Sequence, residues 1–99
     1  MAVSVQVVYW RDIPAQVKAR AGRARSGRAL SDRFQQAIDR AAMRAGLVNT
    51  DEYLAEWRTS EPQERDGDLE AVAAAVAAEL EAAYPDDRID ALAENGGRE

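Results

Sequence analysis

The side chains available for chemistry are few, because this chain of 99 residues contains neither histidine nor cysteine. Disulfides, zinc sites built on imidazole or thiolate, and catalytic triads that use histidine are therefore excluded. Carboxylates, arginines, a single lysine and hydroxyl groups remain, and their spacing suggests no pair of nucleophile and base. We expect no enzymatic activity, no cofactor and no metal site. The lack of cysteine is typical of a cytoplasmic protein.

A basic segment between residues 18 and 33 is the densest group of charges that could bind a ligand. No acidic residue lies between Asp12 and Asp32. The plainest interpretation is a solvated loop whose charge an acidic helix offsets. The alternative is a site for a protein, a small anionic ligand or nucleic acid. Nucleic acid is disfavoured because the net charge is −5 and no aromatic residue lies among the arginines. The residues of this alternative site are Arg23, Arg25, Arg28 and Arg33.

The charge of the whole chain is divided between its two halves. Residues 1–50 carry nine Lys or Arg against three Asp or Glu, and residues 51–99 carry four against fifteen, so +6 and −11 sum to −5. The two halves either face each other within the domain or leave one half free for a partner. We expect part of the attraction to be internal, with the loop at residues 22–28 and the face around Trp10 left unpaired.

The elements that position these residues follow from the apolar patterns. Alternation predicts strands over residues 3–10, 15–21 and 53–59, because successive strand side chains point to opposite faces. Helical spacing and capping residues predict helices over residues 31–45 and 69–84, and one further short helical stretch over 86–93. Residues 22–28 are predicted as a loop. No run approaches the ~18 apolar residues that span a bilayer.

The order β-β-α-β-α predicts an α+β fold, a two-layer sandwich. We expect a three-stranded mixed sheet in the order 2-1-3, with both helices on one face. The other face is then uncovered and carries Gln6, Val8, Trp10, Lys18, Arg20, Leu54, Glu56 and Arg58. An aromatic side chain among arginines is typical of a binding surface. The alternative is that the charged side chains fold over Trp10 and shield it.

A protein partner, or a second copy in a homodimer, is the first candidate for this uncovered face. The residues predicted to contact it are Trp10, Arg11, Lys18, Arg20, Trp57 and Arg58.

Three segments of the chain together are distinctive. They are residues 8–17 (VYWRDIPAQV), 30–42 (LSDRFQQAIDRAA) and 53–57 (YLAEW). With them the chain resembles the small bacterial family labelled "virulence factor", a domain that also begins a staphylococcal conserved virulence factor. The resemblance covers residues 3–84, and we expect one domain over residues 1–94 and a disordered tail over residues 95–99.

The resemblance also implies a role, although it transfers no functional residue. Members of the family carry no assigned enzymatic activity, and free-standing members suggest an accessory subunit in one-carbon metabolism. The partner that this implies is a methylenetetrahydrofolate reductase or a corrinoid methyltransferase component.

Overall fold

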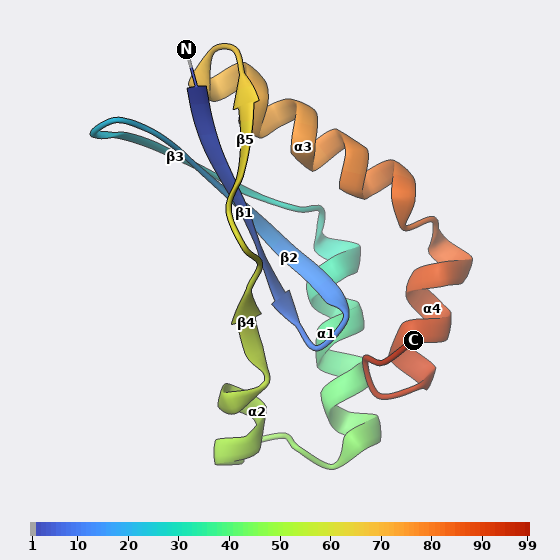
Figure 1. The fold of residues 1–99 in the computed structure, drawn as a ribbon. Helices are drawn as coiled ribbons and strands as arrows, with labels where there is room; N and C mark the ends of the chain where they lie inside the picture. The colour runs from blue at the N-terminus through green and yellow to red at the C-terminus, as the bar shows by residue number, and fades with distance from the viewer. Residues whose placement is uncertain (1) are drawn as a thin grey trace.

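The computed structural model describes residues 2–99, which form one antiparallel sheet with helices against it (Figure 1). The elements in chain order are β1 (Ala2–Trp10), β2 (Ile13–Ala21), β3 (Ala24–Ala29), α1 (Asp32–Ala45), α2 (Asp51–Ala55), β4 (Trp57–Thr59), β5 (Gln63–Asp66), α3 (Leu69–Ala83) and α4 (Asp86–Glu94). Within these residues no helix combines the length and the apolar character that crossing a membrane requires.

The sheet has the order β3-β2-β1-β4, and β5 pairs with the first residues of β1 whereas β4 pairs with its last residues. β4 and β5 share the outer side of β1: Trp57 lies opposite Trp10, and Asp66 lies opposite Ala2. All of these pairs are antiparallel. The predicted three-stranded mixed sheet with two helices is therefore wrong, since the described residues form five antiparallel strands and four helices.

The predicted loop at residues 22–28 is one source of this error. The turn occupies only Gly22 and Arg23, and Gly22 has a φ of 61°, which suits the first position of a two-residue hairpin turn. The chain then pairs with β2 through β3, from Ala24 opposite Ala21 to Ala29 opposite Gln16. Arginine, serine and glycine are weak strand formers, so only the ladder to β2 makes this segment a strand.

The predicted strand over residues 53–59 is the second source. Its first half is the short helix α2, because the hydroxyl of Thr50 caps the helix by accepting a hydrogen bond from the N–H of Tyr53 at 3.2 Å. Only Trp57–Thr59 continues as a strand. A segment of seven residues that alternates is too short for periodicity to separate a helical turn from a strand.

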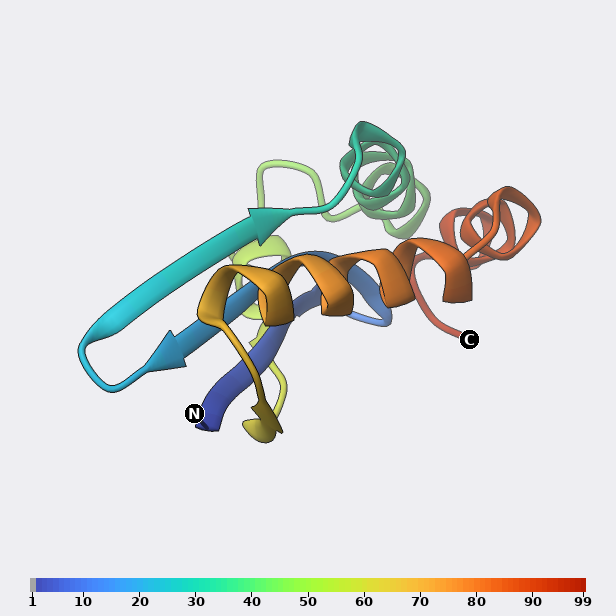
Figure 2. The ribbon, with the colours of Figure 1, turned by 90° about the horizontal axis from the view of Figure 1, so that it is seen from above.

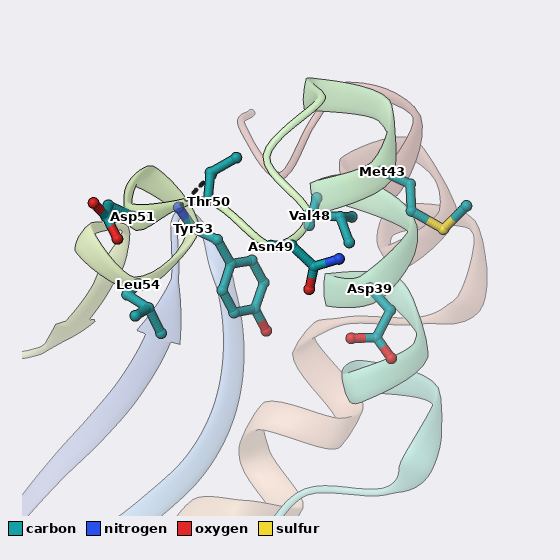
Figure 3. A pocket seen from close by; sticks show the side chains of 9 residues that line it. Asp39, Met43, Val48, Asn49, Thr50, Asp51, Tyr53 and Leu54 are labelled. Carbon is teal, nitrogen blue, oxygen red and sulfur yellow. Dashed lines mark hydrogen bonds between the residues drawn. The ribbon is translucent and has the colours of Figure 1, made fainter.

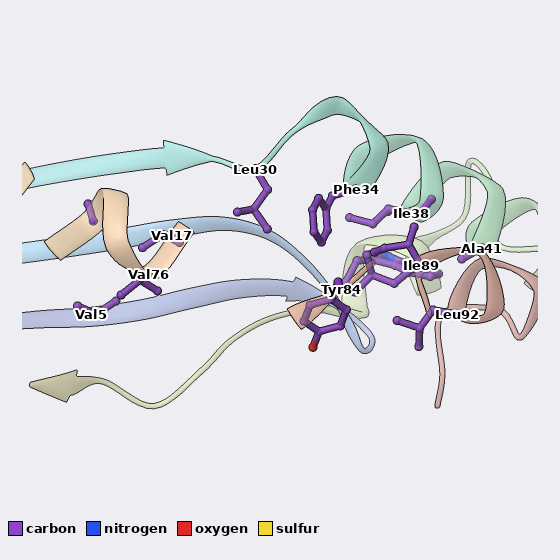
Figure 4. Close-up of a cluster of buried hydrophobic side chains, with 14 of the residues drawn as sticks. Val5, Val17, Leu30, Phe34, Ile38, Ala41, Val76, Tyr84, Ile89 and Leu92 are labelled. Carbon is purple, nitrogen blue, oxygen red and sulfur yellow. The ribbon is translucent and has the colours of Figure 1, made fainter. Parts of the chain in front are cut away.

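One cluster of buried side chains holds the layers together (Figure 4). α3 lies across one face of the sheet (Figure 2), where Val5 and Val17 meet Val76. α1 packs against α4 and against β2. There Phe34 meets Tyr84 edge to face, with 6.0 Å between the ring centroids. The side chains of β2 alternate, so those at positions 17, 19 and 21 are buried while Lys18 and Arg20 are exposed on the opposite face.

Trp10 is the largest fully buried side chain in the described part of the chain, so its predicted exposure is wrong. Its indole N–H donates to the carbonyl of Tyr53 at 2.9 Å. On another side the backbone of Gly97 approaches so closely that a Cβ there would lie 2.9 Å from the indole ring. α2 and the residues after α4 thus cover the face that we expected to be open at this end of the sheet.

The residues after α4 make defined contacts with the turn between β1 and β2. The N–H of Asp12 donates to the carbonyl of Gly97 at 2.8 Å, and the N–H of Glu99 donates to the Asp12 carboxylate at 2.9 Å. The segment predicted as a disordered tail therefore lies against the first hairpin and helps to bury Trp10.

Candidate interaction surface

Ion pairs engage every arginine outside the hairpin of β2 and β3. Each of these side chains has a carboxylate oxygen within 3.5 Å of its guanidinium nitrogens. They are Arg11, Arg33, Arg40, Arg44, Arg58, Arg65, Arg88 and Arg98.

Part of the charge division between the two halves is internal. α1 carries arginines toward α4, where Arg40 meets Asp90 at 3.0 Å and Arg44 meets Glu94. Such exposed pairs each contribute only about 0–1 kcal/mol. They nevertheless use up the positive charge of α1, so this helix offers little free cationic surface to a partner.

The hairpin of β2 and β3 is different, because none of its cations has such a partner within residues 2–99. All of them are exposed, and the hairpin contains no acidic residue. They are Lys18, Arg20, Arg23, Arg25 and Arg28. The positive charge that the fold leaves free is therefore concentrated on one projecting element.

Three of these cations line a cleft of about 460 Å³ on the sheet face opposite α3. Lys18, Arg20 and Arg25 share the cleft with Ser4 and Gln6. In the β-sheet register Arg20 lies directly opposite both Ser4 and Arg25. Like charges opposite each other destabilise a sheet, so stability does not explain this arrangement. The cleft can instead accept carboxylate or phosphate groups from outside.

Glu64 is the acidic residue closest to this cleft in the register of the sheet. It lies opposite Ser4 on the other side of β1. It makes no ion pair with Arg20 or Arg25. The free charge of the hairpin is thus not neutralised from within the sheet.

The structure separates the residues predicted for a protein partner. Lys18 and Arg20 lie in the cleft, whereas Trp10 is buried. Arg11 is held inside, since it donates to the carbonyl of Gly96 at 2.9 Å and pairs with the Glu56 carboxylate at 3.4 Å.

Trp57 and Arg58 lie near the turn of the first hairpin, apart from the cleft. Trp57 is half-buried and packs edge to face on Tyr53, with 6.3 Å between the centroids. Arg58 pairs with Asp12 at 3.5 Å, and its guanidinium lies 4.5 Å from the centroid of the Tyr9 ring. Both side chains therefore stabilise this turn and do not join the basic surface.

The residues predicted for the anion-binding alternative also divide. Arg23, Arg25 and Arg28 belong to the same hairpin as Lys18 and Arg20. Arg33 does not, because its guanidinium donates to the carbonyls of Glu81 and Tyr84 at the end of α3. The two predicted surfaces, one on the sheet and one in a loop, thus lie on one hairpin, with Lys18, Arg20 and Arg25 in the cleft and Arg28 on the opposite face.

A groove of about 570 Å³ between α1 and α2 is a second surface, and the sequence interpretation missed it (Figure 3). It is lined by the large apolar side chains that are most exposed among the described residues: Met43, Val48 and Leu54, at 69%, 48% and 67%. Asp39 and Asp51 lie at its rim and no cation lines it. Met43 falls outside the helical spacing of the buried residues of α1, and an apolar side chain at such a position is the signal that the sequence offers.

The apolar side chains of this groove should contribute little to folding. We expect Met43→Gln and Leu54→Gln each to change the free energy of unfolding by less than about 0.5 kcal/mol, because an exposed side chain gains little from burial. Urea denaturation followed by circular dichroism measures this. Ile38→Ala is the control, because truncating this buried residue of α1 should lower the free energy of unfolding by about 2–5 kcal/mol.

No group of three or more acidic side chains in residues 2–99 is arranged to hold a metal ion. No curated protein and no solved structure matches the chain. A family model described as "Virulence factor" matches residues 8–93, which include the hairpin, the groove and nearly all of the core. The match covers most of the 99 residues, so the chain belongs to the virulence factor family.

Proposed function

We propose that this domain is a non-catalytic interaction module that binds an acidic segment of a protein partner through the hairpin of β2 and β3. The division of ion pairs carries the proposal. Every arginine outside the hairpin is paired with a carboxylate, whereas no cation of the hairpin has an ion-pair partner among residues 2–99. Unpaired cations on exposed strands favour association with acidic surfaces and give it specificity.

A protein segment fits this surface better than nucleic acid does. Proteins that bind single strands combine cations with aromatic side chains on which bases stack. The cleft is lined by serine, glutamine, glycine, alanine, proline and cations, with no aromatic side chain. The net charge of −5 further weakens the attraction for a long polyanion, whereas a short acidic segment can contact the hairpin alone.

The family resemblance supports a more specific version of this proposal. It suggests an accessory subunit in the cytoplasm whose partner belongs to one-carbon metabolism. A purified methylenetetrahydrofolate reductase and a corrinoid methyltransferase component are therefore the first proteins to titrate against the domain.

Two variants with the same change of net charge test the proposal. The hairpin variant is Lys18→Gln/Arg20→Gln/Arg25→Gln, and the control is Arg40→Gln/Arg44→Gln/Arg98→Gln, whose side chains lie in ion pairs elsewhere. The probe is a fluorescein-labelled peptide of ten glutamates, followed by anisotropy at low and moderate salt. We expect the hairpin variant to bind at least about tenfold more weakly than wild type, and the control to bind like wild type.

Three results would contradict the proposal. The first is that wild type fails to bind the peptide. The second is that both variants lose affinity equally, which would indicate a general effect of net charge. In the third case a labelled single-stranded DNA of twenty nucleotides would bind more tightly than the peptide, with the same dependence on the hairpin. That result would favour the nucleic-acid alternative.

A further inference from the structure

The outer edge of β3 is a free sheet edge beside the unpaired cations. β3 stands at the end of the strand order, and no strand of residues 2–99 pairs with its outer side. Five of its six residues are exposed, and Ser26 is half-buried. A free edge presents backbone N–H and carbonyl groups that another strand can use.

The register shows which backbone groups face outward. The N–H of Leu30 donates to the carbonyl of Ala15 at 3.1 Å, and the register places Arg28 opposite Val17. In an antiparallel ladder, residues that bond to the partner alternate with residues that do not. The alternate residues Arg25, Gly27 and Ala29 therefore direct their N–H and carbonyl groups away from β2.

The side chains of β3 leave this edge accessible. Four of its six residues are small, namely Ala24, Ser26, Gly27 and Ala29. The other two are arginines on opposite faces: Arg25 pairs with Arg20 on the cleft face, and Arg28 pairs with the buried-face residue Val17. A strand added about 4.8 Å away would meet a cation above and below the sheet.

We propose that an extended acidic segment of the partner adds to the sheet as a strand along the outer edge of β3. This inference rests on the proposed function and specifies how the partner binds. The added strand accepts and donates backbone hydrogen bonds at Arg25, Gly27 and Ala29. Its carboxylates alternate between the faces of Arg25 and Arg28, so consecutive acidic residues fit better than acidic residues at every second position.

The same charges act against self-association through this edge. Charged edge strands are a common protection against pairing between copies. Two antiparallel copies of β3 would bring the arginines of both strands together, and like charges across a ladder are destabilising. An acidic strand reverses the sign of that interaction. The edge therefore discriminates between a second copy and an acidic partner.

Gly27→Pro tests the hydrogen bonds without changing the charge. Proline removes the outward N–H at position 27 and leaves the ladder to β2 intact, because proline is tolerated on edge strands where its nitrogen faces away from the sheet. Gly27→Ala is the matched control, since Gly27 has no positive φ and the nearest atom to an added Cβ is 4.0 Å away. The probe is a fluorescein-labelled peptide of eight residues, Glu-Glu-Val-Glu-Glu-Val-Glu-Glu.

We expect Gly27→Ala to bind this peptide like wild type and Gly27→Pro to bind it about tenfold more weakly. A version of the peptide that is methylated at alternate backbone nitrogens should bind wild-type protein about tenfold more weakly than the unmethylated peptide does. That second measurement decides the question even when Gly27→Pro fails to fold, which circular dichroism would show.

The outcomes separate this inference from the proposed function. Neutralising Lys18, Arg20 and Arg25 could weaken binding while Gly27→Pro and backbone methylation have no effect. Strand addition would then be overturned, and the interaction module would stand. A wild-type dimer in sedimentation experiments that Gly27→Pro dissociates would also overturn the inference, because a second copy would then occupy the edge. If none of these variants weakened binding, both strand addition and the proposed interaction module would be rejected.

Discussion

Trp10→Ala should lower the free energy of unfolding by about 3–5 kcal/mol, the range for truncation of a large buried aromatic side chain. Small domains are stable by only about 5–15 kcal/mol, so this one change could unfold most of the protein at 37 °C. The indole is 0% exposed and its N–H donates to the carbonyl of Tyr53. Its ring centroid lies 5.6 Å from that of Tyr53, and the Arg11 guanidinium lies 5.2 Å from it.

Urea denaturation followed by far-UV circular dichroism measures this effect. Trp10→Phe is the conservative comparison, because it keeps an aromatic ring but leaves the carbonyl of Tyr53 without its donor. It should lose less stability than Trp10→Ala. Should Trp10→Ala instead unfold like wild type and fail only to bind the acidic peptide, Trp10 would be a contact residue, as the sequence first suggested.

Trp10 was wrongly predicted to be exposed because alternation does not predict burial at the end of β1. Alternation along β2 is regular, and it correctly assigned Lys18 and Arg20 to the face away from α3. The pairing of β1 with β2 shifts register between Val8 and Tyr9, next to Trp10. The segments that cover Trp10 were predicted as a strand and a tail. The burial of one residue therefore depended on contacts between segments far apart in the sequence, which periodicity does not contain.

The helices were predicted more reliably than the strands because their ends have local signals. Gly46 ends α1 with a φ of 71°, and the Asp68 carboxylate accepts a hydrogen bond from the N–H of Ala71 at 3.2 Å at the start of α3. β3 has no comparable signal, since its residues favour a loop and only pairing with β2 makes them a strand. The sequence thus indicated which residues are basic but not that they lie together on one hairpin.

Arg33 illustrates the same limit, because its role depends on a helix about fifty residues away. Its guanidinium donates to the carbonyls of Glu81 and Tyr84 in the last turn of α3. In return the Glu81 carboxylate accepts hydrogen bonds from the N–H and the hydroxyl of Ser31, at 2.7 and 2.8 Å, at the start of α1. The side chain of Ser31 itself makes no capping bond, so each helix supplies the cap that the other needs.

The hydrogen bonds between the two helix ends also change the pKa of Glu81. Burial alone would raise the pKa of Glu81, but the hydrogen bonds from Ser31 and Arg33 outweigh it and lower the pKa below its usual value. A pKa that is lower in the folded state stabilises the fold above the unfolded pKa, near 4.3. This contribution is lost as the pH falls through the folded pKa. The stability of wild type should therefore decline on acidification below about pH 4.5.

We expect Arg33→Ala to lower the free energy of unfolding at pH 7 by about 2–3 kcal/mol, because it removes charged hydrogen bonds to two carbonyls at a helix end. It should also flatten the decline below pH 4.5, since the pKa of Glu81 moves back toward its usual value. Arg23→Ala is the control, as the Arg23 side chain has no ion pair or hydrogen bond among the described residues, and should change stability by less than about 0.5 kcal/mol.

The double variant Arg33→Ala/Glu81→Gln connects this prediction to function. The two residues act as one unit, so the combined loss of stability should be smaller than the sum of the single losses. Additive losses would mean that the two caps are independent. Arg33→Ala should leave the affinity for the acidic peptide unchanged, because its guanidinium is committed to α3 and lies apart from the hairpin. If it weakens binding as much as Arg25→Gln does, Arg33 belongs to the binding surface after all.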